Sequence, residues 1–381
     1  MSSRNLAAFA SHFGDLEDPR HARTRLHPLT NVLVIGLCAV ICGCKHFTQM
    51  EAFGKAKTDW LARFLDLSRG IPSHDTFNTV FARLRPEVFE RALLHWVTAL
   101  QEATAGQILA IDGKTLRGSY RPGDSKALIH MVSVWATANH LSLGSTVVEE
   151  KSNEITAIPR LLGLIDVSGA LVTIDAMGCQ KEIAQKILDA DADYVLAVKD
   201  NQPKLHEAVR TFFTEQLDSD FEATPCQRYS TDERGHGRVE ERNYFVCPVP
   251  QDFPALEQWP GLKALGLVIN RTERDAEEHW EVRHYILSKK LRGRRFADAV
   301  RGHWGIENNL HWQLDVTFRE DDLRVYQGHA PTNLSILMRT ALGLLKNETS
   351  QPGSIETKRL MAGWDDKYLE KVLTTPRVKT R

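Results

Sequence analysis

The sequence predicts an α/β protein in which helices flank a mixed β-sheet. From about residue 107, short β-branched or aliphatic runs typical of strands alternate with longer amphipathic runs typical of helices. Hydrophobic residues make up 42% of the 381 residues and charged residues 25%, which is ordinary for a globular protein and indicates a sizeable core. This length allows two or three domains, or one core with a large insertion.

Residues 1–100 are predicted to form a helical N-terminal domain. The nearly all-apolar stretch 29–41 predicts a buried helix, and it is too short to cross a bilayer, which needs about 20 residues. A second helical stretch follows. Ser73 or Asp75 can cap a third helix, which Pro86 separates from a fourth. Short helices of this kind are equally typical of a DNA-binding module and of a structural cap.

Residues 101–345 are predicted to form the α/β domain. Between about 204 and 290 the alternation gives way to strand-like stretches, which predict a β-rich insertion. A long helix is expected over 296–314, and the remainder, 346–381, is predicted to be a polar C-terminal tail. The other expected elements are strands at 108–111, 129–137, around 147–148, 171–174 and 194–198, and helices at 155–164, 180–190, 204–216 and 334–345.

The formal net charge of −1 neither favours nor excludes a polyanionic partner, because local patches steer nucleic acid. One patch consists of five cations within seven residues, which can neutralise phosphates or form a solvated loop: Lys289, Lys290, Arg292, Arg294 and Arg295. None of the six cysteines forms a Cys-x-x-Cys pair, which argues against a zinc ribbon and favours reduced thiols. No signal peptide is read at the N-terminus.

Three carboxylates are candidates for catalysis. Asp112 and Asp175 each follow a short hydrophobic run, and Glu307 lies in the long helical stretch. Carboxylates at the ends of two strands, with a third on a helix, can hold two divalent cations about 4 Å apart, which is the chemistry of phosphodiester cleavage and strand transfer. Taken alone, each aspartate also fits a turn that begins before a small residue.

Glu307 belongs to a stripe of titratable residues at four-residue spacing, with His303, His311 and Asp315. This spacing predicts that the four share one side of a helix. Histidines beside a carboxylate can bind zinc, but the zinc-hydrolase pattern His-Glu-x-x-His is absent. We therefore expect His303 and His311 to contact phosphate or to position Glu307.

Several cations near the carboxylates are candidate phosphate ligands: Lys114, Arg117, Lys199 and Arg301. The alternative is that they balance the charge of the acidic cluster. The segment 233–242 is a glycine-containing polar turn that leads into a strand, and its His236 and Arg238 are candidates for contact with DNA. By itself this segment fits a hairpin turn better.

Four motifs in order resemble those of the DDE-class transposases of bacterial insertion sequences, in the subgroup of the H-repeat-associated proteins of Rhs elements. They are Ile-Asp-Gly-Lys-Thr-Leu-Arg-Gly-Ser (111–119), Ile-Asp-Ala-Met-Gly-Cys-Gln (174–180), Tyr-Val-Leu-Ala-Val-Lys-Asp-Asn-Gln (194–202) and the segment from His303 to Asp321. The segments 18–20 and 70–77 match the leader region of that subgroup. The resemblance covers roughly residues 12–345.

The resemblance implies a ribonuclease-H-like core with a β-rich insertion before the last catalytic residue. It also implies that Asp112, Asp175 and Glu307 bind two Mg²⁺ ions, for which Mn²⁺ substitutes. The wider family has a Tyr-x-x-Arg-x-x-x-Glu-x-x-x-x-x-x-Lys signature, of which only Glu307 is kept here, since Val300, His303 and Leu314 stand at the other places.

These features together predict a DNA transposase that cleaves the ends of an insertion element and joins the 3′-hydroxyl to target DNA. The expected partner is double-stranded DNA, with the protein a dimer on it, no membrane contact and a bacterial cytoplasmic location. Two alternatives are a metal-dependent DNA nuclease without strand transfer and an inactive DNA-binding remnant of a mobile element.

Overall fold

The computed structural model describes residues 13–14, 16–99, 107–119, 129–137, 141–148, 154–235, 238–274 and 277–374. By their contacts these residues form two compact units. The first unit comprises Met1–Ala103, Gly113–Lys151 and Glu307–Arg381, and the second comprises Thr104–Asp112 and Ser152–Ile306.

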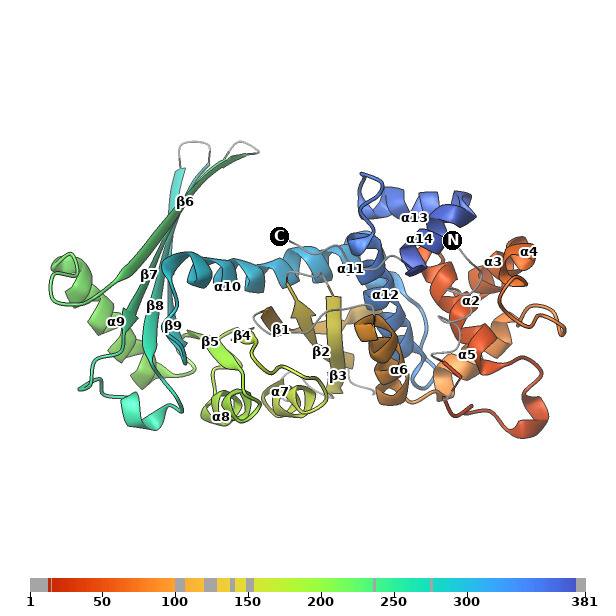
Figure 1. Ribbon diagram of the computed structural model, residues 1–381, viewed down its shortest axis with the longest axis horizontal. Helices are drawn as coiled ribbons and strands as arrows, with labels where there is room; N and C mark the ends of the chain where they lie inside the picture. The colour runs from red at the N-terminus through yellow and green to blue at the C-terminus, as the bar shows by residue number, and fades with distance from the viewer. Residues whose placement is uncertain are drawn as a thin grey trace. The chain divides into compact units, whose positions relative to one another are not determined.

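Figure 1 labels the helices and strands of both units. The helices of the described residues are α2 (Leu29–Ile41), α3 (Phe47–Ala56), α4 (Thr58–Leu61), α5 (His74–Arg83), α6 (Pro86–Ala99), α7 (Glu154–Leu162), α8 (Lys181–Asp189), α9 (Pro203–Asp218), α10 (Gly293–Ile306), α11 (Trp312–Val316), α12 (Ala330–Asn347), α13 (Ile355–Trp364) and α14 (Asp366–Thr374). The strands are β1 (Ile108–Leu116), β2 (Ile129–Ala136), β3 (Leu141–Val148), β4 (Leu171–Ile174), β5 (Asp193–Val198), β6 (Gln227–Gly235), β7 (Arg238–Pro248), β8 (Ala264–Arg274) and β9 (Glu277–Leu287).

The strands pair in the order β3-β2-β1-β4-β5-β9-β8-β7-β6. Strand β4 runs parallel to both β1 and β5. The pairs β2–β3, β5–β9, β8–β9, β7–β8 and β6–β7 are antiparallel. This is a mixed sheet flanked by helices, so the predicted fold class is confirmed.

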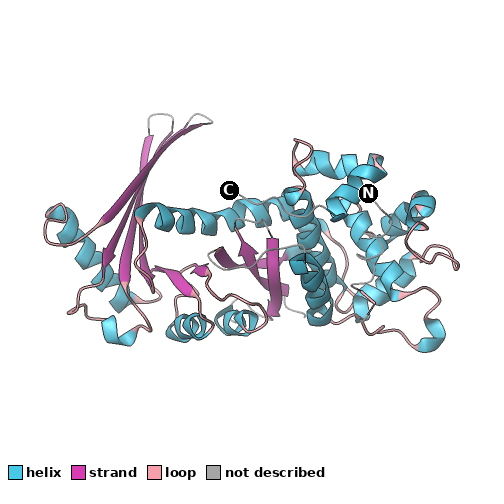
Figure 2. Ribbon diagram, in the orientation of Figure 1, coloured by secondary structure: helices cyan, strands magenta, loops and turns pink. Residues whose placement is uncertain are grey.

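In the second unit, helices cover both faces of the parallel strands (Figure 2). Side chains alternate between the two faces of a strand. Thr173 faces α10, since its hydroxyl lies 3.3 Å from the ring of His303. The next residue, Ile174, faces α7, because a side chain on Gly178 would meet both Ile174 and Ile158. Strands β4 and β5 are largely buried, which explains their short and mostly hydrophobic sequences.

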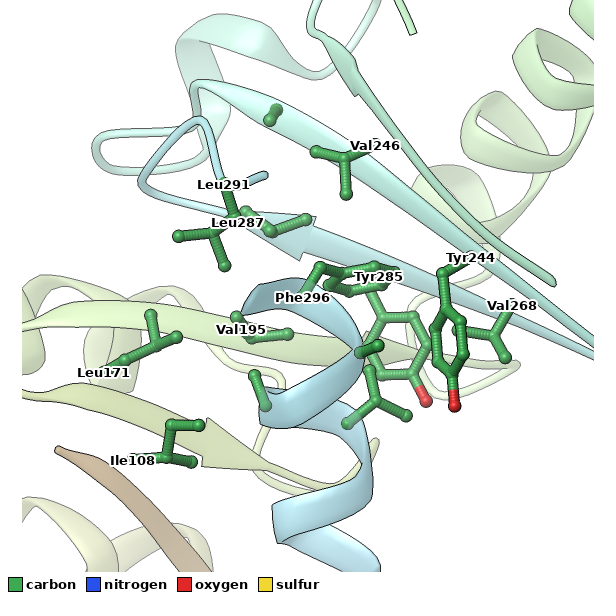
Figure 3. Close-up of a cluster of buried hydrophobic side chains, with 14 residues drawn as sticks. Ile108, Leu171, Val195, Tyr244, Val246, Val268, Tyr285, Leu287, Leu291 and Phe296 are labelled. Carbon is green, nitrogen blue, oxygen red and sulfur yellow. The ribbon is translucent and has the colours of Figure 1, made fainter. Parts of the chain in front are cut away.

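The predicted β-rich insertion is present as the antiparallel strands β6 to β9. It extends the same sheet, since Val195 of β5 pairs with Leu287 of β9. The first half of α10 packs on this sheet in a hydrophobic cluster (Figure 3). There the ring of Phe296 stands edge-on to Tyr285 and Tyr244, with centroids 5.4 and 6.2 Å apart. These contacts fix the position of α10 along the sheet.

The first unit has a helical core around α12. This helix packs against α2, α5 and α6, and the buried Asn333 amide donates 2.8 Å hydrogen bonds to the carbonyls of Phe81 and Leu84. Helix α2 is apolar on all sides because α3, α5, α12 and α13 surround it. Ser73 caps α5 by accepting from the Thr76 N–H at 3.4 Å, as one of the two predicted caps.

Three elements differ from the sequence predictions. Strand β6 was not predicted. The expected helix over 296–314 is interrupted, because a π-helical segment, Glu307–His311, separates α10 from α11. The expected polar tail contains α13 and α14, whose sparse apolar residues are enough to bury one face: Leu369, Val372 and Leu373 of α14 are each at most 2% exposed. Among the described residues, no helix combines the length and apolar character needed to cross a membrane.

Candidate active site

Asp112 and Asp175 stand at equivalent places on two neighbouring parallel strands. Ile111 of β1 pairs with Ile174 of β4, and each aspartate is the next residue of its chain. Both side chains are partly buried. The structure thus brings these two carboxylates to one edge of the parallel strands. Asp112 does not begin a turn, because β1 continues to Leu116 and is five residues longer than predicted.

The turn after β4 fixes the carboxylate of Asp175. One oxygen, Oδ1, accepts hydrogen bonds from the backbone N–H of Met177 at 3.1 Å and of Gly178 at 3.3 Å. Such an Asx turn holds the side chain in one rotamer. Gly178 is required for this turn because a Cβ atom there would overlap the side chain of Ile174. The position of Asp175 is therefore set by the backbone rather than by long side chains.

The loop after β5 forms hydrogen bonds with the turn that follows β4. After β5 ends at Val198, the Asn201 amide donates to the carbonyl of Ala176 at 2.5 Å, and the Gln202 amide donates to the carbonyl of Cys179 at 3.0 Å. Lys199 opens this loop and is exposed. Because β4 and β5 are parallel, Lys199 emerges at the same edge as Asp175. Its ammonium group is therefore available to a phosphate near the carboxylate edge.

His303 lies on α10 and faces β4. Its Nδ1 is 3.3 Å from the hydroxyl of Thr173, which in turn lies 3.4 Å from the carbonyl of Leu109 on β1. Burial lowers the pKa of His303 below its usual value, while the nearby Asp175 carboxylate acts in the opposite direction. The ring is therefore neutral at pH 7, and it ties α10 to the strands that carry both aspartates.

Cations of the β-rich insertion hold the end of α10. The guanidinium of Arg283 lies 4.3 Å from the ring centroid of Trp304, and that of Arg242 lies 5.6 Å from it. Arg301, three residues before Trp304 on α10, forms an ion pair with Glu233 of β6. These contacts stack and pair α10 on the insertion. The ion pair is what the charge-balance interpretation of Arg301 expects, and its contact with phosphate stays a prediction.

The third predicted catalytic residue, Glu307, is exposed and is the first residue of the π-helical segment. This segment turns through i→i+5 hydrogen bonds instead of the i→i+4 bonds of the predicted uninterrupted helix. His303 belongs to the second unit, whereas Glu307, His311 and Asp315 belong to the first. π-helical insertions occur frequently at functional sites.

In the first unit, a buried ionic cluster surrounds Lys114. Its ammonium lies 2.6 Å from Asp315 and 2.7 Å from Glu320, and Arg339 lies 2.8 Å from Glu320. Lys114 is 8% exposed, and the side chains of Glu320 and Arg339 are each 1% exposed. Burial alone would raise the pKa of Glu320, yet the charges of Arg339 and Lys114 lower it to about 2. These ion pairs are what the charge-balance interpretation of Lys114 expects, and its contact with phosphate stays a prediction.

Sequence reasoning missed Glu320 and Arg339. Arg339 interrupts the apolar helical stretch 334–345, and this lone charge was the signal that could have marked it. His311 lies close to the same cluster, where burial and the charges of Arg339 and Lys114 lower its pKa to about 3. The residue is partly buried, and its predicted role beside phosphate or Glu307 stays a prediction.

The other predicted DNA-binding residues are dispersed. Arg117 is exposed, 3.9 Å from Asp321. Arg238 is 2.7 Å from Glu240, and His236 lies outside the described residues.

The basic segment 289–295 lies at the start of β5, where Lys289 pairs with Asp193 at 2.8 Å. It is therefore at the edge of the parallel strands opposite to Asp175. The structure does not bring Lys289, Lys290, Arg292, Arg294 and Arg295 together with the carboxylates. A hollow of about 920 Å³ beside α9 and residues 250–254 also contains none of the candidate residues.

Comparisons with known proteins agree with the motifs. A family model described as DDE_Tnp_1-associated matches residues 10–97, and one described as Transposase DDE domain matches residues 103–344. The chain is 40% identical to "Putative transposase YncI" of Escherichia coli O157:H7, over 98% of this chain and 96% of that protein. It is 36% identical to "H repeat-associated putative transposase YhhI" of Escherichia coli strain K12, over 97% of this chain and 98% of that protein.

Among solved structures, the piggyBac transposase in a synaptic complex with hairpin DNA matches 99% of this chain and 80% of its own, with 12% sequence identity and a TM-score of 0.37. The sequence matches define the class of protein as a DNA transposase. The chain belongs to the DDE-domain transposase family, and its relatives include H-repeat-associated transposases. The resemblance predicted from the motifs is confirmed.

Proposed function

We propose that this transposase cleaves the ends of an insertion element and joins the freed 3′-hydroxyl to target DNA. The observation that carries the proposal is the equivalent position of Asp112 and Asp175 on adjacent parallel strands, in a chain of the DDE-domain family. Glu307 is the third catalytic carboxylate by its sequence motif. It is exposed and stands four residues after His303, which contacts the strand of Asp175 through Thr173.

The chemistry of these donors fits magnesium. Carboxylate oxygens are the hard ligands that Mg²⁺ takes, usually one or two from the protein with phosphate oxygens completing the shell. Within the described ranges, no group of three or more His, Cys, Asp or Glu side chains is arranged to hold a metal ion. Asp112, Asp175 and Glu307 would hold two Mg²⁺ ions, or Mn²⁺ in their place, and the ions would supply charge stabilisation for an in-line displacement at phosphorus.

In this proposal, residues of the chain orient Asp175 and helix α10 and bind DNA phosphates. The Asx turn holds Asp175 in one orientation, and the neutral ring of His303 keeps α10 against β4. Lys199, exposed at the same edge, is the residue that we assign to a DNA phosphate there. A second contact with DNA is assigned to the opposite edge and its exposed cations: Lys290, Arg292 and Arg294.

A joining assay tests the proposal against cleavage without joining. Purified protein is incubated with pre-cut element ends, supercoiled target plasmid and Mg²⁺. A transposase yields recombinant molecules in which the 3′ end of the element is linked to target DNA. Nicked or linear plasmid without recombinants would instead identify a nuclease, and binding without any cleavage would identify an inactive remnant.

Two element ends must meet for transposition, so we propose that the protein acts as a dimer on DNA. Light scattering of the protein with one element end would then give a mass of two chains and two DNA molecules. A complex of one chain with one DNA molecule at all concentrations would contradict this. Because the proposed substrate is DNA, we assign the protein to the bacterial cytoplasm.

A further inference from the structure

Two cysteines face each other across the strands β6 and β7. Gln227 pairs with Val246, so Cys226, the residue before Gln227, lies opposite Cys247 on the antiparallel partner. Cys226 and Cys247 therefore lie at opposed places on the two neighbouring strands. Directly opposed residues of antiparallel strands project to the same face with Cα atoms about 4.5–5.5 Å apart, and a disulfide spans about 4.4–6.8 Å. The backbone there already suits a disulfide.

The two thiols differ in their surroundings. Cys247 is fully buried, whereas Cys226 is partly exposed at the start of the edge strand. Arg228, two residues along β6, projects to the same face as Cys226. Its guanidinium lies 2.8 Å from Asp220 and 4.9 Å from the ring centroid of Phe221, so it is held in place. Cys226 is thus accessible to solvent and lies beside a fixed positive charge.

These surroundings favour a thiolate at Cys226. The neighbouring Cys247 thiol, helped by the charge of Arg228, lowers the pKa of Cys226 to about 7 although burial acts against it. The nearness of Cys226 and burial raise the pKa of Cys247 far above its usual value. Of the two thiols, Cys226 is therefore the one that ionises first.

The remaining four cysteines lack this activation. Burial raises the pKa of Cys42 to about 12 and that of Cys44 to about 11. It likewise raises the pKa of Cys179 to about 12 and that of Cys38 well above its usual value. The chain therefore provides its own internal controls for thiol reactivity.

We propose that Cys226 and Cys247 form an oxidation site, in which Cys226 reacts first with a peroxide and Cys247 then closes a disulfide with it. In the first step, the Cys226 sulfur attacks one oxygen of hydrogen peroxide and the O–O bond breaks. The sulfur is oxidised to a sulfenic acid, and the peroxide is reduced to water. In the second step, the Cys247 sulfur attacks the sulfenic sulfur, the S–S bond forms, the S–O bond breaks and the hydroxyl leaves as water with the thiol proton.

This site is independent of the proposed DNA chemistry. The disulfide would join Cys226, the residue before the edge strand β6, to Cys247 of β7. Strand β6 also carries Glu233, the ion-pair partner of Arg301 on α10. Oxidation therefore fixes a strand that otherwise has one hydrogen-bonded neighbour in the sheet.

Competitive alkylation of the folded, full-length protein tests the activation of Cys226. Limiting iodoacetamide is added at pH 7 and each cysteine peptide is quantified by mass spectrometry. We expect Cys226 to react on the order of 100-fold faster than Cys44, because its larger thiolate fraction outweighs its weaker intrinsic nucleophilicity. The rate should rise through an inflection near pH 7, which Arg228→Gln moves upward. Equal rates at Cys226 and Cys44 would overturn the proposal.

Peroxide treatment tests the second thiol. In the wild type and in the control Cys44→Ser, the intact mass should fall by two hydrogen atoms, and digestion should give a cross-linked peptide pair that contains Cys226 and Cys247. In Cys247→Ser, the sulfenic acid should persist at Cys226 and be trapped by dimedone. The proposal fails if the wild type accumulates dimedone-labelled Cys226 without the cross-link. Circular dichroism checks that each variant is folded, and the wild-type cross-link decides the question if Cys247→Ser is not.

Discussion

The hydroxyl of Thr173 lies 3.3 Å from Nδ1 of His303, at the point where α10 crosses the strand that carries Asp175. Thr173→Val keeps the shape of this side chain and removes its hydroxyl. We expect the free energy of unfolding to fall by about 1 kcal/mol, because a buried hydrogen bond is lost. We also expect cleavage to fall more than DNA binding, since His303 loses its partner on β4. Urea unfolding and a nicking assay measure the two effects.

The control for this prediction is Thr214→Val. Thr214 is an exposed residue of α9 whose hydroxyl bonds only within its own helix, to the carbonyl of Arg210. Its replacement should change neither stability nor cleavage. If Thr173→Val cleaved DNA at the wild-type rate, the contact with His303 would have no part in positioning Asp175.

Gly178 sets the turn that orients Asp175. A methyl group at this position would overlap Ile174, so Gly178→Ala should destabilise the protein by about 1–3 kcal/mol. Gly163→Ala is the matched control, because a Cβ there would have only ordinary contacts, at 3.4 Å from the nearest backbone oxygen. Thermal unfolding of both variants checks the difference. Equal stability of the two would show that the chain relaxes around Gly178 at no cost.

Lys114 and Arg117 are close in sequence, but we expect their replacement to have different effects on stability. Lys114→Met leaves the buried Glu320 short of one partner and should cost about 3–5 kcal/mol of stability. Arg117 is 80% exposed, so Arg117→Met should leave stability almost unchanged. Denaturant unfolding measures both changes. If Lys114→Met were fully stable but bound DNA more weakly, the result would support a contact between Lys114 and DNA phosphate.

His284 should make the fold sensitive to acid. Burial, aided by the charges of His206 and Arg210, lowers its pKa to about 4. Above pH 6.5 the ring is neutral in both the folded and the unfolded chain. Between pH 6.5 and 4 only the unfolded chain binds the proton, so stability is lost as the pH falls. At about 1.4 kcal/mol for each pKa unit, the loss is on the order of 3 kcal/mol.

Unfolding measured from pH 7 to pH 4, wild type beside His284→Gln, checks this dependence. The variant should lose less stability over the interval, because one buried imidazole is absent. His311, with its pKa lowered to about 3, should leave a residual slope in both proteins. Parallel curves for the two proteins would contradict the assignment to His284.

Much of the fold follows from local sequence patterns. Local patterns predicted the strands β4 and β5 and the helices α2 and α5. Their buried residues are apolar and either consecutive or regularly spaced in the sequence. Strand β6 was not predicted, because it is an edge strand in which Tyr229 and Thr231 are only partly buried among exposed polar residues. Periodicity of 3.6 residues likewise cannot reveal the π-helical segment that begins at Glu307.

The candidate site was predictable in part for a similar reason. Asp112 and Asp175 follow hydrophobic runs whose pairing as parallel strands brings them together. The pairing of Lys114 with Glu320 joins residues 206 positions apart, which no local pattern encodes. The basic segment 289–295 was a clear signal of charge, but its place at the opposite edge depends on the antiparallel pairing of β9 with β5.

Nicking of a plasmid that carries the element's own ends tests the catalytic role of Asp175 most directly. Wild type, Asp175→Asn and the control Glu182→Gln, an exposed residue of α8, are compared with Mg²⁺ and with Mn²⁺. We predict that wild type and Glu182→Gln nick the element boundaries, while Asp175→Asn binds the same DNA and nicks it on the order of 1,000-fold more slowly. An Asp175→Asn variant that nicks at the wild-type rate would contradict the assignment of this carboxylate.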